Sequence, residues 1–246
     1  MSRPLCLITG ASGGIGAACA LRAAEEGYDL VLTYNGNRDG AEETAAQARA
    51  LGADVAVRQT DVADPQAIHD LFAQIDDLGP LAALVNNAGI TAPPARAAEL
   101  THDRLRAIFD VNVIGAMLVA GAAVRRMVPR KSGAIVNITS IAARTGAPDL
   151  FVDYAASKAA LETYSKGLAL EVAGAGVRVN AVAPGLIDTD IHARSGDPGR
   201  LARTAPNVPL GGRAGTAREV ADAVLYLLSD AASYITGTTL DVTGGR

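Results

Sequence analysis

Tyr154 and Lys158 are the residues of this sequence whose types and spacing most directly suggest chemistry. A helical pattern begins near Asp153, and two side chains four residues apart on a helix lie on one face, about one turn from each other. An ammonium near a phenol favours phenolate, so we expect Lys158 to lower the pKa of Tyr154 below its usual value of about 10. The pair predicts a group that donates and accepts protons near neutral pH.

The elements around this helix supply two more polar groups. Residues 134–138 form a mainly apolar run that predicts a buried strand, and Ser140 follows its carboxyl end. Asn112 lies among apolar neighbours inside a second helical pattern, 101–127. Because asparagine is a weak helix former, this amide is either a hydrogen-bonded core group or one that bends the helix and holds a water.

A glycine-rich turn at residues 10–16 separates a short apolar run, residues 5–9, from a helical pattern at residues 17–26. Strand, glycine turn and helix open a dinucleotide-binding unit. Glycines let the backbone approach a pyrophosphate, and the helix start offers free N–H groups with a partial positive charge. Tight packing alone is the structural alternative for these glycines.

The same turn also satisfies G-x-S-x-G, with Ser12 at the position of a hydrolase nucleophile. Such a hydrolase needs an acid and then a histidine later in the chain. The available histidines, His69, His102 and His192, are scattered and lie in no suggestive setting. We therefore favour the dinucleotide-binding interpretation.

The end of the second predicted strand, residues 29–34, indicates which nicotinamide cofactor is used. Enzymes that prefer NAD usually place a carboxylate there to hold the adenosine ribose. This chain has Asn35, with Arg38 close behind, which favours NADP(H). Asp39, and a solvated position of Arg38, keep NAD(H) open.

Strand and helix patterns alternate along the whole chain, which predicts an α/β fold with a parallel sheet of seven strands and helices on both faces. Residues 86–89 follow the fourth strand, and their small side chains and amides suit close approach to a cofactor. Residues 186–215 lose regular periodicity and are predicted to form a lid or substrate loop. No linker or composition break divides residues 1–246, so we expect one domain.

The composition limits the classes of partner that we expect this protein to bind. Hydrophobic residues make up 49%, charged residues 20%, and the net charge of −4 offers no general attraction to nucleic acid or anionic membranes. With no signal-peptide pattern and no apolar run long enough to span a bilayer, we expect a cytoplasmic protein that acts on a small molecule. Cys6 and Cys19 are predicted core residues, and the scattered histidines indicate no metal site.

Taken together, these motifs resemble the short-chain dehydrogenase/reductase family over nearly the full chain, and most closely its glucose 1-dehydrogenase-like and 3-oxoacyl-(acyl carrier protein) reductase-like members. The resemblance rests on Thr9, Gly10, Gly14, Ile15, Gly16, Asp61, Asn86, Asn87, Ala88, Gly89, Asn112, Ser140, Tyr154, Lys158, Pro184, Gly185 and Thr189. It implies a Rossmann fold, a homotetramer, and NADP(H)-dependent interconversion of a carbonyl and a secondary alcohol. Family members that only sense NADP are the alternative, but these commonly lose the tyrosine or the lysine, and this chain keeps both.

The resemblance also implies individual roles. Ser140 would bind the substrate carbonyl, Tyr154 would act as general acid/base, Lys158 would tune Tyr154 and bind the nicotinamide ribose, and Asn112 would position a water. Asp61 with Val62 would meet the adenine, and Ile187 with Thr189 the nicotinamide carboxamide. The full predicted cofactor set is Gly10, Ser12, Gly13, Gly14, Ile15, Gly16, Asn35, Arg38, Asp61, Val62, Asn87, Ala88, Gly89, Tyr154, Lys158, Pro184, Gly185, Ile187 and Thr189.

The sequence departs from the family pattern at Gly13, and the family pattern does not identify the substrate. Many NADP-using relatives carry a basic residue where this chain has Gly13, so the NADP(H) preference rests on the end of the second strand. The substrate is not predicted. Its pocket is expected along residues 141–153 and 186–215, with Arg144, Leu150, Phe151, His192 and Arg194 as candidate contacts.

Overall fold

The structure, a computed structural model, describes residues 3–189, 197 and 199–246. Within these residues a parallel sheet of seven strands runs in the order β3-β2-β1-β4-β5-β6-β9. The order reverses between β1 and β4, where consecutive crossovers leave in opposite directions and ligand sites of open α/β sheets form. The strands are β1 (Leu5–Ile8), β2 (Asp29–Tyr34), β3 (Val55–Gln59), β4 (Leu81–Asn86), β5 (Gly133–Ile138), β6 (Val177–Pro184) and β9 (Thr239–Val242).

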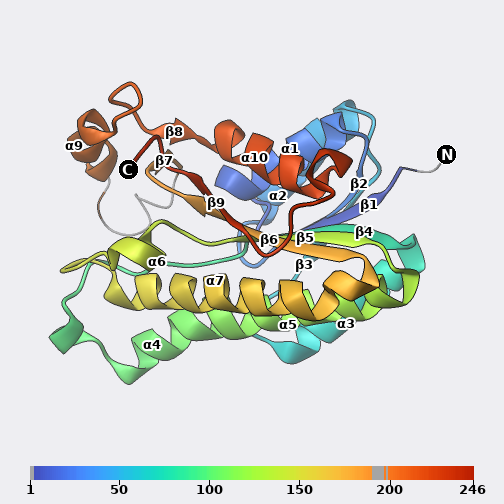
Figure 1. The fold of residues 1–246 in the computed structure, drawn as a ribbon, viewed down its shortest axis with the longest axis horizontal. Helices are drawn as coiled ribbons and strands as arrows, with labels where there is room; N and C mark the ends of the chain where they lie inside the picture. The colour runs from blue at the N-terminus through green and yellow to red at the C-terminus, as the bar shows by residue number, and fades with distance from the viewer. Residues whose placement is uncertain (1–2, 190–196, 198) are drawn as a thin grey trace.

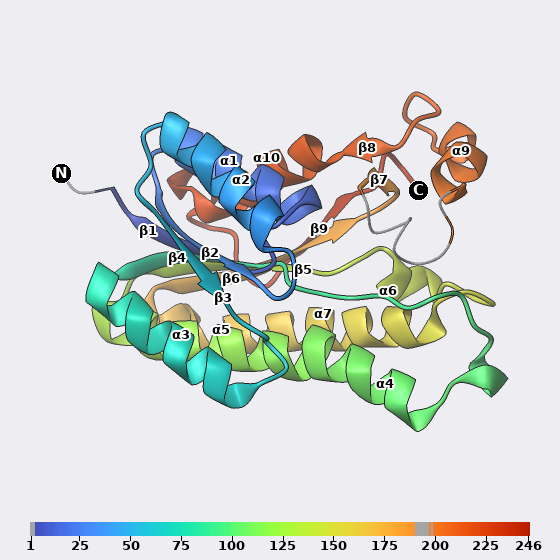
Figure 2. The ribbon, with the colours of Figure 1, turned by 180° about the vertical axis from the view of Figure 1, so that it is seen from behind.

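Helices cover both faces of the sheet, so the molecule has three layers (Figures 1 and 2). One face carries α1 (Gly14–Glu25), α2 (Arg38–Ala50) and α10 (Ala217–Leu228). The opposite face carries α3 (Pro65–Leu78), α4 (His102–Phe109), α5 (Ala116–Met127) and α7 (Val152–Val172). This arrangement confirms the predicted α/β sheet with helices on both faces.

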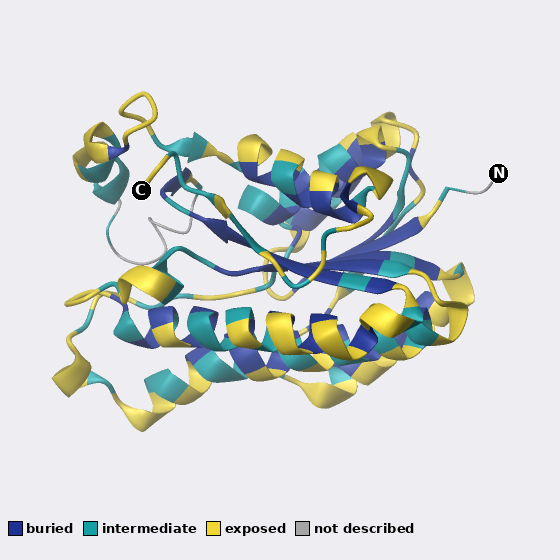
Figure 3. Cartoon of the chain, in the orientation of Figure 1, coloured by how far each residue is buried: buried dark blue, intermediate teal, exposed yellow. Residues whose placement is uncertain are grey.

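The sheet is buried between these layers, as Figure 3 shows. Along β1, Cys6 and Ile8 belong to the core cluster under α1 and α10, whereas Leu5 and Leu7 belong to the cluster under α3 and α5. Successive side chains of a strand point to opposite faces, so a strand covered on both sides needs a continuous apolar run. Cys19 joins Cys6 in the first cluster, which confirms the prediction that both cysteines are core residues.

One prediction about apolar runs is wrong. By length and composition alone, the helical stretch His102–Arg130 is long and apolar enough to cross a membrane. Half of its most apolar window is buried inside the protein, where Val119, Ala120 and Ala123 pack against the sheet. The apolar residues of this stretch thus contribute to the core of the protein.

The structure differs from the sequence prediction in three places. The 101–127 helix is interrupted by a π-helical segment, Asp110–Gly115, between α4 and α5. The 186–215 stretch contains regular structure that its sequence does not predict: α9 (Arg200–Thr204), and β7 (Ile187–Asp188), which pairs with β8 (Gly215–Thr216). A short helix, α6 (Ala142–Thr145), follows β5. Strands of two residues are too short for hydrophobic periodicity to reveal.

Candidate active site

The carboxyl ends of β1, β2, β3 and β4 enclose a cleft of about 420 Å³ beside the glycine turn, the glycine-turn cleft. Twelve residues of the predicted cofactor set line it directly, and the Asn87 amide donates to the Gly10 carbonyl of the turn at 3.0 Å. The lining members of that set are Gly10, Ser12, Gly13, Gly14, Ile15, Asn35, Asp61, Val62, Asn87, Ala88, Gly89 and Thr189. The structure therefore brings most of the predicted set into one cavity.

The glycine turn needs its glycines for two different reasons. Gly10 adopts a left-handed φ of +67°, and a Cβ on Gly16 would lie 2.2 Å from the Gly10 carbonyl oxygen, so both positions are fixed by the protein's own packing. At Gly13 a Cβ would meet no atom within 4 Å. Gly13 also precedes α1 without a side-chain cap, which leaves the first N–H groups of the helix available to an anion.

The end of β2 presents amides and glycine to this cleft. Asn35, Gly36 and Asn37 line it, and Asn37 caps α2 by accepting a hydrogen bond from the Gly40 N–H at 3.1 Å. Arg38 is exposed as the first residue of α2 and is outside the cleft lining. Across the cleft, the Asp61 carboxylate accepts the Ala63 N–H at 2.9 Å, so it is held by its own turn.

Asn112 lies inside the π-helical segment and is fully buried. Its side-chain oxygen accepts the Ile90 N–H at 2.8 Å, and its amide donates to the Ile90 carbonyl at 2.9 Å and to Ser157 Oγ at 3.1 Å. The Ser157 hydroxyl in turn donates to the Tyr154 carbonyl at 2.7 Å. From within the π-helical segment, Asn112 therefore ties the loop after β4 to the helix that carries Tyr154.

Lys158 is buried beneath the same loop. Its Nζ donates to the Ile138 carbonyl at 2.9 Å, and a Cβ on Gly89 would lie 3.2 Å from this Nζ and 3.2 Å from the Asn112 side-chain oxygen. Burial lowers the pKa of Lys158 to about 8. A glycine at position 89 thus leaves room for the Lys158 amine. In mildly alkaline solution this amine is only partly protonated.

Tyr154 differs from the sequence prediction. Burial raises the pKa of the phenol above 10, while a hydrogen bond from Ser140 and the positive charge of Arg200 act in the opposite direction. The Lys158 Nζ lies 5.7 Å from the centroid of the Tyr154 ring, and the charge that acts on the phenol is Arg200. The expected lowering of the Tyr154 pKa by Lys158 is therefore wrong for this structure, because desolvation of the phenol outweighs its charged neighbours.

Tyr154 and Ser140 line a second cavity of about 380 Å³, the tyrosine cavity. Leu150 and Phe151, two candidate substrate contacts, also line it, as does Gly185. Pro184 lies one residue outside, and its carbonyl accepts the Ile141 N–H at 3.0 Å. Arg144 instead forms ion pairs with Asp241 and Glu162, and His192 and Arg194 lie outside the described residues.

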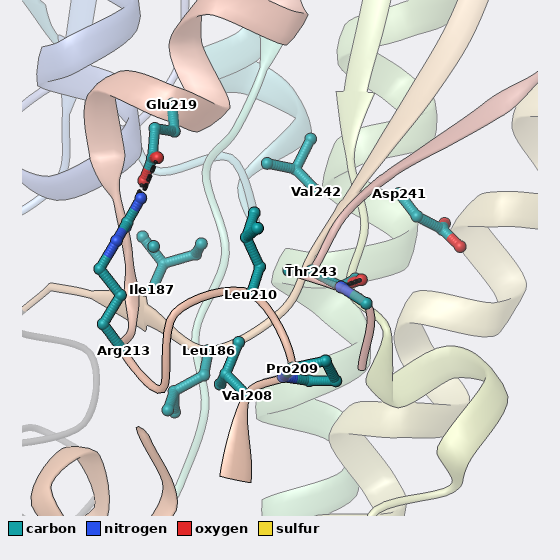
Figure 4. Close-up of a pocket in the computed structure, with 13 residues that line it drawn as sticks. Leu186, Ile187, Val208, Pro209, Leu210, Arg213, Glu219, Asp241, Val242 and Thr243 are labelled. Atoms are coloured by element: carbon teal, nitrogen blue, oxygen red, sulfur yellow. Dashed lines mark hydrogen bonds and ion pairs between the residues drawn. The ribbon is translucent and has the colours of Figure 1, made fainter. Parts of the chain in front are cut away.

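A further cavity, of about 600 Å³, lies elsewhere and is shown in Figure 4. Leu186, Val208 and Leu210 give it an apolar lining, and an ion pair between Arg213 and Glu219 at 2.6 Å borders one side. Ile187 lines this cavity through β7, and it is the one member of the predicted cofactor set found there. Two of the predicted catalytic residues, Ser140 and Tyr154, line the tyrosine cavity instead.

Sequence reasoning missed the residues that hold the tyrosine helix. Asp153, whose side chain has no exposed surface, accepts the Arg104 guanidinium at 2.6 Å and the Tyr154 N–H at 2.9 Å. It also missed Arg200 and Arg246, which line the tyrosine cavity. The position of Asp153 beside Tyr154 was a usable signal, whereas the arginines come from distant segments whose pattern does not predict where they lie.

A family model described as enoyl-(acyl carrier protein) reductase matches residues 10–246. An uncharacterised oxidoreductase of Escherichia coli K12, YgfF, is 45% identical over 246 residues, which covers 98% of this chain and 99% of the relative. The chain belongs to the short-chain dehydrogenase/reductase family. This confirms the resemblance stated from the motifs, and the protein is an NAD(P)-dependent oxidoreductase of that family.

Other members extend the comparison. A 3-oxoacyl-(acyl carrier protein) reductase of Staphylococcus aureus is 37% identical over 242 residues, covering 97% of this chain and 96% of the relative. A crystal structure of a short-chain type dehydrogenase/reductase from Mycobacterium marinum matches with a TM-score of 0.92 at 33% identity, covering 98% of this chain and 94% of that one. The chain thus shares the Rossmann fold of other short-chain dehydrogenases/reductases over most of their length.

Proposed function

We propose that the protein interconverts a carbonyl compound and a secondary alcohol, with NADP(H) as its preferred cofactor and Tyr154 as general acid/base. The observation that carries the proposal is that the Ser140 and Tyr154 side chains line the same cavity, close enough for Ser140 to act on the pKa of the phenol. Two hydroxyls on one wall can both meet a carbonyl oxygen as charge develops on it. Next to them, Lys158 donates a hydrogen bond to the Ile138 carbonyl, and Asn112 donates one to the Ile90 carbonyl.

The residues of the glycine-turn cleft fit a dinucleotide. Gly13 leaves open space above the uncapped start of α1, and the cleft continues past Asp61 and Val62 to Asn87 and Gly89. A bound nicotinamide cofactor supplies or accepts the hydride. Gly89, Lys158 and Thr189 are the residues nearest to where the nicotinamide end would be held.

The protonation states of the site favour carbonyl reduction at neutral pH. Burial keeps the pKa of Tyr154 above its ordinary value, so the phenol is protonated and can donate its proton to the substrate oxygen. The Ser140 hydroxyl lies beside it as the second donor. Lys158 holds its proton below about pH 8, where it hydrogen-bonds the Ile138 carbonyl and stays beside Gly89.

The preference for NADP(H) rests on the end of β2. A carboxylate there would repel the 2′-phosphate, and this chain offers Asn35, Gly36 and Asn37 instead. Arg38 stands next to them, exposed and without an ion-pair partner among the described residues, so its guanidinium is available to a phosphate.

A homotetramer that acts on a small molecule in the cytoplasm completes the proposal. Family resemblance suggests the assembly, in which the long helices 101–128 and 153–173, on the face that carries α3, α4, α5 and α7, would pack across one two-fold interface, and the last strand and helix across another. Ile114, Leu118 and Leu170 support it, because these large apolar side chains are exposed on that face.

Tyr154→Phe tests the proposed chemistry. We expect turnover of a panel of ketones and aldehydes with NADPH, followed at the nicotinamide absorbance, to fall by about 10²-fold or more, the usual size of a lost general acid. NADPH affinity should be nearly unchanged. Tyr164→Phe is the matched control, because Tyr164 lies on the same helix and its hydroxyl donates to the Met117 carbonyl at 3.2 Å, away from the cavity. Normal turnover by Tyr154→Phe would contradict the proposal.

A further inference from the structure

Two arginines contribute to the tyrosine cavity opposite an otherwise mostly apolar lining. Arg200 comes from α9 and Arg246 from the segment after β9, while Ile141, Leu150 and Phe151 supply much of the remaining surface. The Arg200 guanidinium is stacked over the Phe151 ring, with its central carbon 5.0 Å from the ring centroid. This contact holds one cation in a fixed place at the cavity wall.

The negative charge of Asp197 acts on Arg200, but no described residue forms an ion pair with either Arg200 or Arg246. Neighbouring Arg203, in contrast, pairs with Asp197 at 2.5 Å. Burial lowers the pKa of Arg200, and the positive charge of Arg246 lowers it further. A half-buried guanidinium beside a second cation is costly unless an anion joins them.

Arg200 also acts on the reacting group. Its charge is the one that lowers the pKa of the Tyr154 phenol, so the guanidinium lies within electrostatic reach of the proton donor. The glycine-turn cleft, which would hold the phosphates of a cofactor, has a separate lining that includes neither arginine. An anion that binds these two arginines would therefore lie in the tyrosine cavity.

From this geometry we infer that the substrate carries a carboxylate, which Arg200 and Arg246 bind while its carbonyl faces Ser140 and Tyr154. The inference rests on the proposed function and adds its substrate class: short oxo acids and the corresponding hydroxy acids. Guanidinium groups match the two oxygens of a carboxylate, and the apolar lining suits the carbon chain between the two ends. Arg200 is thereby a specificity-determining residue of the cavity.

The test compares acids with their uncharged counterparts. Turnover with NADPH is measured for 2-oxobutanoate, 3-oxobutanoate and 4-oxopentanoate, each beside its methyl ester, so that the carboxylate is tried at three distances from the carbonyl. For at least one pair we expect kcat/KM to favour the acid by about 10-fold or more, the scale of a charge-assisted hydrogen bond. Arg200→Gln should reduce this acid-to-ester ratio by a similar factor.

Arg203→Gln is the control, because Arg203 lies on the same short helix but is exposed, paired with Asp197 and outside the cavity lining. It should leave the ratio unchanged. Acid-to-ester ratios near one in the unaltered enzyme, or equal loss for acid and ester in Arg200→Gln, would overturn the inference. The ratio also separates this role from an effect of Arg200 on Tyr154, which would change both substrates alike.

A binding measurement makes the test independent of turnover. Butanoate should raise the unfolding temperature of the NADPH complex more than butanamide does, and Arg200→Gln should remove that difference. Stabilisation by inorganic phosphate without any by butanoate would overturn the carboxylate assignment. Ester turnover that survives Tyr154→Phe would count against the proposed function, whereas a neutral-substrate preference with an inactive Tyr154→Phe would count against this inference alone.

Discussion

Lys158, like Asp153, is a charged residue that the fold buries. Its Nζ has the Ile138 carbonyl as its hydrogen-bond acceptor, and burial lowers its pKa to about 8 from an ordinary 10.5. Folding therefore releases a proton from this group between these two pH values. The cost of burying the ammonium is full below about pH 8 and fades as the group becomes neutral.

This linkage gives a prediction with a definite sign. Between about pH 8 and pH 9.5 the unfolded chain binds more protons at Lys158 than the folded chain, so the lysine becomes less costly as pH rises. We expect the unfolding free energy of the natural protein, relative to Lys158→Met, to rise by roughly 1 kcal/mol per pH unit. Urea unfolding of both proteins across this range measures it.

Taking the difference between the two proteins cancels the other groups that titrate there. Cys6, whose pKa burial raises to about 12, would by itself make stability fall with rising pH, but it is present in both. A difference that stays flat from pH 8 to pH 9.5 would mean that the pKa of Lys158 is not depressed.

The placement of Ser140, Tyr154 and Lys158 was predictable from the sequence, but the electrostatics around them were not. Spacing along one helix predicted that Tyr154 and Lys158 share a face, and the apolar run before Ser140 predicted its strand end. The pKa of Tyr154 depends on how much water the fold removes and on Arg200, which lies 46 positions away in the printed sequence. Desolvation and long-range neighbours are set by tertiary packing, which a local pattern does not contain.

At the scale of elements, the π-helical segment between α4 and α5 is the feature that links the fold to the cofactor. It ends at Gly115, where a Cβ would lie 2.3 Å from the Val62 carbonyl oxygen. Val62 lines the glycine-turn cleft. The helix therefore passes directly under the loop after β3, and glycine at 115 sets their closest approach.

Gly115→Ala should separate these two elements. Because the added methyl meets backbone rather than a flexible side chain, we expect a loss of about 1–3 kcal/mol in unfolding free energy, with weaker NADPH binding as Val62 moves. Gly121→Ala, in the same helical run, is the control, since its Cβ would come no closer than 3.8 Å to the end of Arg125. It should be neutral or stabilise by up to about 1 kcal/mol. Equal effects of the two substitutions, in urea unfolding and NADPH titration, would contradict the close-approach argument.

Most elements of this fold were predictable because each has a sequence pattern that extends over many residues. The strands are apolar runs, and the helices have apolar periodicity with ends marked by residues such as Asp64 and Gly52. The π-helical segment was signalled only by one amide, Asn112, and its geometry follows from hydrogen bonds to Ile90 that come from another part of the chain. The β7–β8 pair has two residues in each strand and leaves no pattern to detect.

At the scale of the whole molecule, the glycine-turn cleft joins parts of the chain that are far apart in sequence. Its lining comes from the turn after β1, the ends of β2 and β3, the loop after β4 and Thr189. The sequence predicted this gathering, since the carboxyl ends of parallel strands meet at one edge of a sheet. Because the cleft spans so many elements, a ligand bound there stabilises the folded chain as a unit.

Cofactor preference can therefore be read from the stability of the whole protein. At a concentration 100 times its Kd, NADPH should add about 2.7 kcal/mol, which is roughly 5–10 °C in Tm for a chain of this size. With Asn35 where an NAD-preferring enzyme has a carboxylate, NADH at the same concentration should raise Tm distinctly less.

Arg38→Ala should shrink the NADPH shift and leave the NADH shift nearly unchanged, because only NADPH has the 2′-phosphate. Arg49→Ala, at the other end of α2, should change neither shift, whatever it does to Tm itself. Equal shifts with the two cofactors in the natural protein would show that the end of β2 does not select NADP(H).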